Sequence, residues 1–166
     1  MPDESLGGSR WGRLALNVAL GELRECAREV GGDNRGPWVR KYLNGLAPEG
    51  SPWCAAFVSW CFAQNPDGMP FRYGVCARTI LAQFKSNGWV CTRGAEDSPR
   101  PGDIVVWWRD KPDGWQAHVG FVHHLASGLL HTIEGNKAGR VRACTPGPDE
   151  MKRLLGYGRV PDAWRP

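Results

Sequence analysis

The sequence predicts an α+β domain in which N-terminal helices pack on an antiparallel β-sheet. Patterns typical of helices come first along the chain, and strand-like runs follow them. Two of these runs flank Ala126-Ser127-Gly128, which indicates a β-hairpin. The 166 residues are 42% hydrophobic, enough for one buried core. We therefore expect a flexible N-terminal tail over residues 1–10 and a single domain over residues 11–166.

Four helices are expected in the first half of the chain. Apolar residues at helical spacing predict the first over residues 13–30, ended by Gly31-Gly32. The second covers residues 37–43 and has a proline in its first turn. The third covers residues 51–64, with Ser51 as its N-cap and Pro52 at the first helical position. The fourth covers residues 77–87 and is ended by Gly88.

Strands are expected in the second half. Residues 103–108 follow a Pro-Gly turn and are mostly apolar, and residues 117–125 and 129–135 form the predicted hairpin. Residues 140–144 and 154–160 are expected to add two more strands.

Composition and charge limit the possible partners. The net charge is +4 and the sequence pI is about 8.8, with the charges scattered along the chain. This balance favours an anionic polymer, but no basic run predicts a nucleic-acid partner. No stretch approaches the roughly 20 apolar residues of a membrane span, so no membrane insertion is expected. The polar first ten residues do not resemble a signal peptide.

Cysteine usage argues for free thiols. The six cysteines contain no CxxC pair, so a structural zinc site is not expected. A domain of this size does not need disulfides, and most of the six are expected to be small buried hydrophobic residues. They are Cys26, Cys54, Cys61, Cys76, Cys91 and Cys144.

Cys54 is the candidate nucleophile. It falls in the first turn of the predicted third helix, where the helix dipole and free N–H groups favour an anion such as a thiolate. Phe57, Val58 and Cys61 follow it at helical spacing, so the sulfur should lie where the helix meets the sheet. Cys61 lies about 10 Å further along the helix and is expected to be structural.

His118 and Glu134 are the candidate partners of this thiol. If residues 124 and 128, or 125 and 129, pair across the hairpin, then His118, Glu134 and Asn136 share one face of the sheet. Glu134 or Asn136 could then accept a hydrogen bond from His118 Nδ1, and Nε2 would face the thiol. An odd register would break this arrangement.

Three other histidines are alternatives to His118. His123 and His124 are adjacent and point to opposite faces of the predicted strand, and His131 lies on the other strand of the hairpin. All three lie close to the turn of the hairpin and away from the end that carries Glu134. Their spacing does not match a zinc-ligand pattern.

Four segments in order resemble the CHAP family (cysteine, histidine-dependent amidohydrolase/peptidase) of the NlpC/P60 superfamily. They are Trp53-Cys54-Ala55-Ala56-Phe57-Val58-Ser59-Trp60, Pro101-Gly102-Asp103-Ile104-Val105-Val106-Trp107, His118-Val119-Gly120-Phe121-Val122 and Thr132-Ile133-Glu134-Gly135-Asn136. The resemblance implies a papain-like fold and a peptidoglycan hydrolase. By position Cys54 is the nucleophile, His118 the general base, Glu134 the third member and Asn136 a supporting polar residue.

The resemblance implies cleavage of a wall amide, either the sugar–peptide bond (N-acetylmuramoyl-L-alanine amidase) or a bond within the stem or cross-bridge (endopeptidase). Two alternatives remain open: a papain-like effector that deamidates or transamidates a protein, and a catalytically dead wall-binding module.

The expected substrate contacts are Asn34, Arg35, Trp53, Trp115 and Gln116. Of these, Arg35 would bind the carboxylates of wall peptides.

No cofactor is expected. Some members of this family bind calcium in an acidic loop before the cysteine, but residues 44–50 carry a single carboxylate, Glu49, so no metal is expected. The predicted partner is bacterial peptidoglycan, with an immunity protein if the chain is an antibacterial effector, and the protein is expected to be a monomer. It would be made in the cytoplasm and act in the periplasm or wall after release through a phage pore or a secretion system.

Overall fold

The structure is a computed structural model and is described for residues 8–91 and 98–166. Its helices are α1 (Arg10–Arg24), α2 (Pro37–Leu43), α3 (Cys54–Ala63), α4 (Ala77–Ser86) and α5 (Pro148–Met151). Its strands are β1 (Val90–Cys91), β2 (Ile104–Trp108), β3 (Ala117–Ala126), β4 (Leu129–Lys137), β5 (Arg140–Cys144) and β6 (Leu154–Gly158). Residues 1–7 of the predicted tail lie outside the described residues, whereas Ser9 is buried and Arg10 begins α1.

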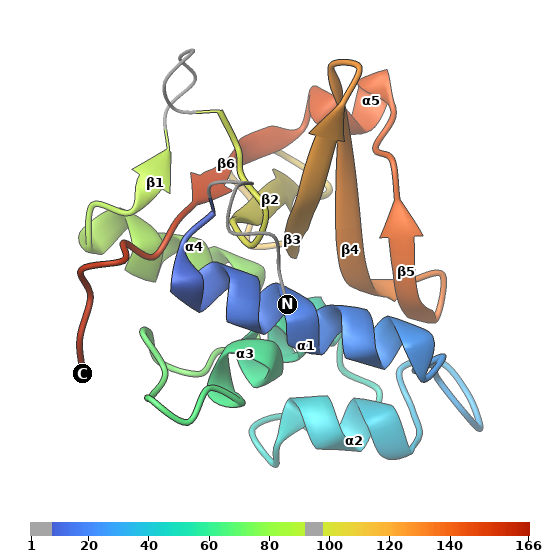
Figure 1. Ribbon diagram of the computed structural model, residues 1–166. Helices are drawn as coiled ribbons and strands as arrows, with labels where there is room; N and C mark the ends of the chain where they lie inside the picture. The colour runs from blue at the N-terminus through green and yellow to red at the C-terminus, as the bar shows by residue number, and fades with distance from the viewer. Residues whose placement is uncertain (1–7, 92–97) are drawn as a thin grey trace.

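The strands form one antiparallel sheet in the order β1-β6-β2-β3-β4-β5 (Figure 1). Helices α1 to α4 lie together on one side of it, and the main core fills the space between these layers. A smaller apolar cluster that includes Val105, Trp107 and Val122 covers the opposite face of the sheet. The predicted α+β architecture, with a papain-like arrangement of helices on an antiparallel sheet, is confirmed. No described helix is long and apolar enough to span a membrane.

Helix α1 differs from its prediction at both ends. It begins at Arg10, where the Ser9 hydroxyl accepts a hydrogen bond from the Gly12 amide. It ends at Arg24 rather than at Val30, because Cys26 adopts a left-handed conformation (φ 57°) and the chain turns toward the sheet. Arg28 then forms a bridge with Arg140 on β5, so hydrogen bonding to the sheet edge replaces the last predicted helical turns. Gly31 and Gly32 therefore belong to a loop.

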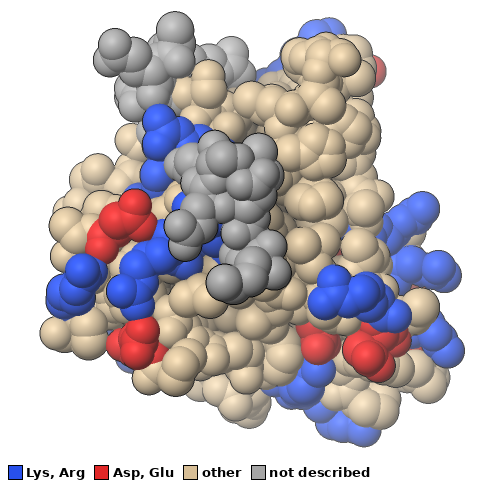
Figure 2. Space-filling model, in the orientation of Figure 1, with Lys and Arg blue, Asp and Glu red and all other residues tan. Residues whose placement is uncertain are grey.

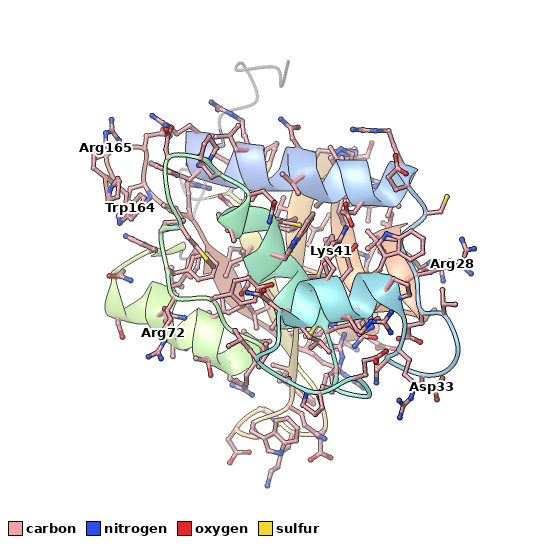
Figure 3. All side chains as sticks on the ribbon, turned by 90° about the horizontal axis from the view of Figure 1, so that it is seen from below. Arg28, Asp33, Lys41, Arg72, Trp164 and Arg165 are labelled. Atoms are coloured by element: carbon pink, nitrogen blue, oxygen red, sulfur yellow. The ribbon has the colours of Figure 1, made fainter. Side chains whose placement is uncertain are left out.

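Helix α3 begins at Cys54, three residues later than predicted. Its N-cap is Trp53, which makes no side-chain capping bond, so the prediction of Ser51 as the cap is wrong. The Ser51 amide instead donates to Pro48 O in a turn before the helix. Nearly every residue of α3 is buried, because α1 and α2 pack against it from one side and β3 and β4 from the other. Figure 3 shows α3 between α1 and α2 and in front of the sheet, with Lys41 of α2 beside it.

The β3–β4 hairpin has a different register near its turn than predicted. Ala126 pairs with Leu129 and Leu125 with Leu130, which is the odd register. A bulge between Val122 and His124 then shifts the pairing by one residue, so that Val122 faces Thr132. The even register expected for the end of the hairpin that carries His118 and Glu134 is therefore present, although the pairing assumed at the turn is wrong.

Candidate active site

Cys54 occupies the first position of α3, and its side chain is almost fully buried where the helix meets β3. Burial alone would raise the pKa of the thiol. The adjacent His118 imidazole, together with hydrogen bonds from the Val119 and Ala55 amides, outweighs this effect and lowers the pKa of Cys54 below its usual value. The site therefore favours a thiolate, which is the nucleophilic form of cysteine.

His118 lies on β3 and is hydrogen-bonded to Glu134 on β4, with 2.8 Å between His118 Nε2 and Glu134 Oε2. Burial alone would lower the pKa of His118, but the Cys54 and Glu134 side chains raise it to about 9. The indole of Trp107, on the neighbouring strand β2, stacks on the imidazole with 5.9 Å between ring centroids. These contacts fix the ring between the thiol and the carboxylate.

The ring nitrogens have the opposite roles to those predicted. Because Nε2 bonds Glu134, Nδ1 is the nitrogen left for the hydrogen bond that His118 makes with the Cys54 thiol. Of the two predicted acceptors, Glu134 makes the contact. Asn136 adopts a left-handed conformation (φ 57°) at the end of β4 and lines the cavity beside Cys54 and His118.

Glu134 is fully buried, and several groups hold its charge. Burial alone would raise the pKa of its carboxyl group, but His118, the Thr132 hydroxyl and Lys137 lower it below the usual value. Thr132 Oγ1 donates to Oε1 at 2.7 Å, and Lys137 Nζ lies 3.6 Å from Oε2. This carboxylate is therefore ionised and oriented toward the imidazole.

Sequence reasoning gave no role to Gly120, Thr132 or Lys137. A Cβ at Gly120 would lie 2.8 Å from Glu134 Cγ, so only glycine leaves room for the carboxylate at this position. Gly120 and Thr132 lie within the quoted family segments, and the even register places both on the Glu134 face. The even register could therefore have identified Gly120 and Thr132 as neighbours of Glu134 from the sequence.

Cys54, His118 and Asn136 open into a cavity of about 470 Å³. Its other walls come from the loop before α3, the start of α4 and the loop between β2 and β3. Two predicted substrate contacts, Trp115 and Gln116, line it, and the Trp115 side chain is 72% exposed. A reactive group at the base of an apolar cavity with few polar walls is typical of a substrate site.

Three other predicted substrate contacts do not line this cavity. Trp53 is fully buried and stacks on Tyr42, with its indole N–H donating to Glu29, so it is a core residue. Asn34 donates to the Gly50 carbonyl and accepts from the Gly50 amide. Asn34 and its neighbour Arg35 therefore lie behind the loop that leads to Cys54.

The remaining cysteines with described side chains are free thiols in varied surroundings. Cys61 is buried, and burial raises the pKa of its thiol well above the usual value, as expected for a structural residue. Cys26 is exposed and Cys76 and Cys144 are half-buried, so the expectation that most cysteines are buried holds only for Cys54 and Cys61. The Cys91 side chain lies outside the described residues.

The alternative histidines gather near the turn of the hairpin. The imidazoles of His124 and His131 stack at 4.4 Å, and that of His123 lies 4.7 Å from that of His124. Within the described ranges, no cluster of His, Cys, Asp or Glu side chains is arranged to hold a metal ion. Glu49, the single carboxylate of the loop before α3, accepts from the Gly36 amide and the Arg40 guanidinium, and these contacts do not fit a calcium site.

Comparison with known proteins gives one family and one fold. The family model "CHAP domain" matches residues 46–136. Two solved structures are similar: the crystal structure of Ly7917 (20% identity, TM-score 0.53) and that of Ly7917 with the hydrolyzing product of MDP (18% identity, TM-score 0.51). The alignments cover 89% and 88% of this chain but only 62% and 63% of those chains. No curated protein matches the sequence.

Proposed function

The chain belongs to the CHAP family, within the NlpC/P60-like cysteine peptidase superfamily, and on that premise we propose that it is a peptidoglycan hydrolase that cleaves an amide bond through Cys54. The observation that carries the proposal is the Cys54–His118–Glu134 arrangement, of which Cys54 and His118 line an open cavity. A wall substrate is supported by the similar solved structure, that of Ly7917 with the hydrolyzing product of MDP. Because this chain spans less than two thirds of that neighbour, its specific activity is part of the proposal.

The proposed reaction begins with a thiolate–imidazolium pair. The Cys54 thiolate attacks the amide carbonyl and forms a C–S bond, and the carbonyl π electrons move to oxygen. When the tetrahedral intermediate collapses, His118 Nδ1 donates its proton to the leaving amine nitrogen and the C–N bond breaks. Water, deprotonated by the now neutral His118, then hydrolyses the thioester and releases a carboxylic acid.

The start of α3 would stabilise the oxyanion of this intermediate. The Cys54 amide is the first of the helix and has no partner within it, since the first intrahelical bond of this turn is donated by Phe57 to Trp53 O. A free N–H next to the nucleophile, at the positive end of the helix dipole, is suited to bind the developing negative charge.

The cellular location of the enzyme is proposed from its proposed substrate. An enzyme with this substrate would act in the periplasm or wall, after release through a phage pore or a secretion system. An effector of this kind would be neutralised by an immunity protein that covers the cavity. On the face shown in Figure 2, positive and negative side chains intermingle over the helical layer, which is compatible with weak attraction to an anionic wall.

The first test is digestion of purified peptidoglycan by wild type and by Cys54→Ala, with the soluble products identified by mass spectrometry. We expect fragments from wild type alone, and their masses distinguish an amidase from an endopeptidase. If wild type releases nothing while Cys54 still reacts quickly with iodoacetamide, a protein substrate for deamidation or transamidation replaces the wall. If wild type binds the wall and Cys54 is unreactive, the chain is a wall-binding module.

A further inference from the structure

The catalytic carboxylate belongs to a longer row of alternating charges. Lys137 lies between Glu134 and Glu150, with its Nζ 2.9 Å from Glu150 Oε1 and 3.3 Å from Oε2. Arg109 Nη2 donates to the same Glu150 Oε1 at 3.1 Å. The row therefore runs from the imidazole of His118 to the guanidinium of Arg109, across strands β3 and β4, helix α5 and the end of β2.

Arg109, at the far end of this row, also lines the cavity beside Cys54. Among the described residues that line the cavity, it is the only one with a permanently charged side chain. Its backbone amide donates to Gln116 O, which ties it to the loop that also carries Trp115. The side chain is 31% exposed, so it is anchored and yet accessible to a ligand.

The guanidinium is incompletely satisfied by these protein contacts. Arg109 donates to only one carboxylate oxygen of Glu150, whereas Lys137 Nζ contacts both oxygens of that group. The other side-chain hydrogen bond of Arg109, from Nη1 to Trp108 O, is long at 3.3 Å. These bonds use only part of the N–H donors of a guanidinium, whose planar fork is suited to binding both oxygens of a carboxylate. A partly desolvated arginine with free donors favours an anionic group on the bound substrate.

We propose that Arg109 is a carboxylate-recognition site, and that the enzyme selects wall peptides carrying a free carboxylate within reach of the scissile amide. This proposal rests on the proposed function. It replaces Arg35 with Arg109 as the arginine that binds wall-peptide carboxylates, because Arg35 does not line the cavity. Glu150 holds the guanidinium in place, while the remaining donors of Arg109 face the substrate.

The test uses a synthetic wall fragment that contains the bond identified by digestion, together with analogues in which one carboxylate at a time is a carboxamide. For wild type, we expect one of these conversions to lower kcat/KM by at least about tenfold, since a charge-assisted bidentate contact is lost. Arg109→Gln should cleave the parent fragment and that analogue at similar rates. Arg109→Lys should keep part of the discrimination, because it retains the charge but lacks the fork.

Arg28→Gln is the matched control. Arg28 is exposed beyond the end of α1 (Figure 3) and lines a different pocket with Arg140 and Val141, so its loss should leave the discrimination unchanged. If wild type cleaves the parent and every analogue equally, the recognition site is refuted and the proposed function stands. If Arg109→Gln still discriminates, another residue reads the carboxylate. If wild type cleaves none of the fragments or the intact wall, the proposed function itself fails.

Discussion

Two cysteines of one helix show how the surroundings of a thiol determine its chemistry. Cys54 and Cys61 are both buried on α3, and burial raises the pKa of each thiol. At Cys54 the imidazole of His118 and two amides reverse that effect, whereas Cys61 has no comparable partner among the groups that shift its pKa. The difference in expected reactivity comes mainly from His118 and Val119 on β3, which are distant from Cys54 in sequence.

We therefore predict that Cys54 reacts fastest with iodoacetamide at pH 6, where ordinary thiols are protonated. Peptide mapping after brief labelling should find Cys54 modified before the exposed Cys26, and Cys61 unmodified until the protein unfolds. In His118→Ala the labelling of Cys54 at pH 6 should slow at least about tenfold. Equal labelling of Cys26 and Cys54 in wild type would contradict the assignment of Cys54 as an activated nucleophile.

His118 and Glu134 should differ in their cost to catalysis. His118→Ala removes the group that carries the proton, so we expect kcat to fall by about 10³-fold or more. Glu134→Gln keeps a hydrogen-bonding group beside the ring and should cost less, because Glu134 orients the imidazole without transferring its proton. Turnover of a defined wall fragment measures both. The opposite order would mean that these roles are wrongly assigned.

The pH profile should reveal the charge of Glu134. The raised pKa of His118 predicts that activity falls as pH rises through about 9, because the imidazolium needed to protonate the leaving amine is lost. Glu134→Gln removes a negative charge that favours the imidazolium, so its alkaline limb should lie at lower pH than that of wild type. An unshifted limb in this variant, measured in kcat/KM, would show that Glu134 does not act through His118.

At the scale of elements, the sequence predicted most of the structure, and the failures at α1 and α3 share one physical cause. Short-range signals located α2, α4, β5 and both strands of the hairpin. The end of α1 and the cap of α3 were missed because tertiary contacts, the bridge to β5 and the burial of Trp53, override local preference. The bulge near His123 was also missed, because nothing in the local sequence marks it.

The grouping of Cys54, His118 and Glu134 could be predicted from the sequence, whereas most of the expected substrate contacts could not. His118 and Glu134 lie on strands whose alternation allowed a shared face to be inferred, and Cys54 was placed by its position in the first turn of α3. Trp53, Asn34 and Arg35 lie in irregular segments, where backbone direction depends on distant contacts, and their side chains do not line the cavity. The identity of the bonded nitrogen of His118 depends on a side-chain rotamer, which periodicity cannot predict.

A substitution at Gly120 on β3 tests whether the Glu134 carboxylate needs the space beside this glycine. Gly120→Ala places a methyl group against Glu134, so we expect the free energy of unfolding to fall by about 1–3 kcal/mol and activity to drop as the carboxylate moves. Gly147→Ala is the control, because no atom lies within 4 Å of a Cβ there and its φ of −77° suits alanine. Urea unfolding and turnover measure both effects. Full activity in Gly120→Ala would show that the carboxylate position is not critical.

At the scale of the whole molecule, one buried ion pair connects the start of β2 to the segment after β6. The Asp103 carboxylate is 1% exposed and accepts from Arg159 Nε at 2.9 Å and Nη2 at 2.7 Å. The Arg100 amide also donates to it. Burial raises the pKa of Asp103 even though these donors oppose that change, so the ion pair carries a large desolvation cost.

We predict that Arg159→Leu lowers the free energy of unfolding by about 3–5 kcal/mol at pH 7, because it leaves a buried carboxylate without its main partner. The carboxyl group of this variant should have a folded-state pKa well above its unfolded value, so stability should recover as pH falls and the group becomes neutral. Lys152→Leu, which removes an exposed ion pair with Asp149, should change stability little. Urea unfolding at pH 7 and pH 5 measures both variants. A loss in Arg159→Leu that is equal at the two pH values would assign the cost to lost packing of the arginine side chain, and not to the unpaired charge of Asp103.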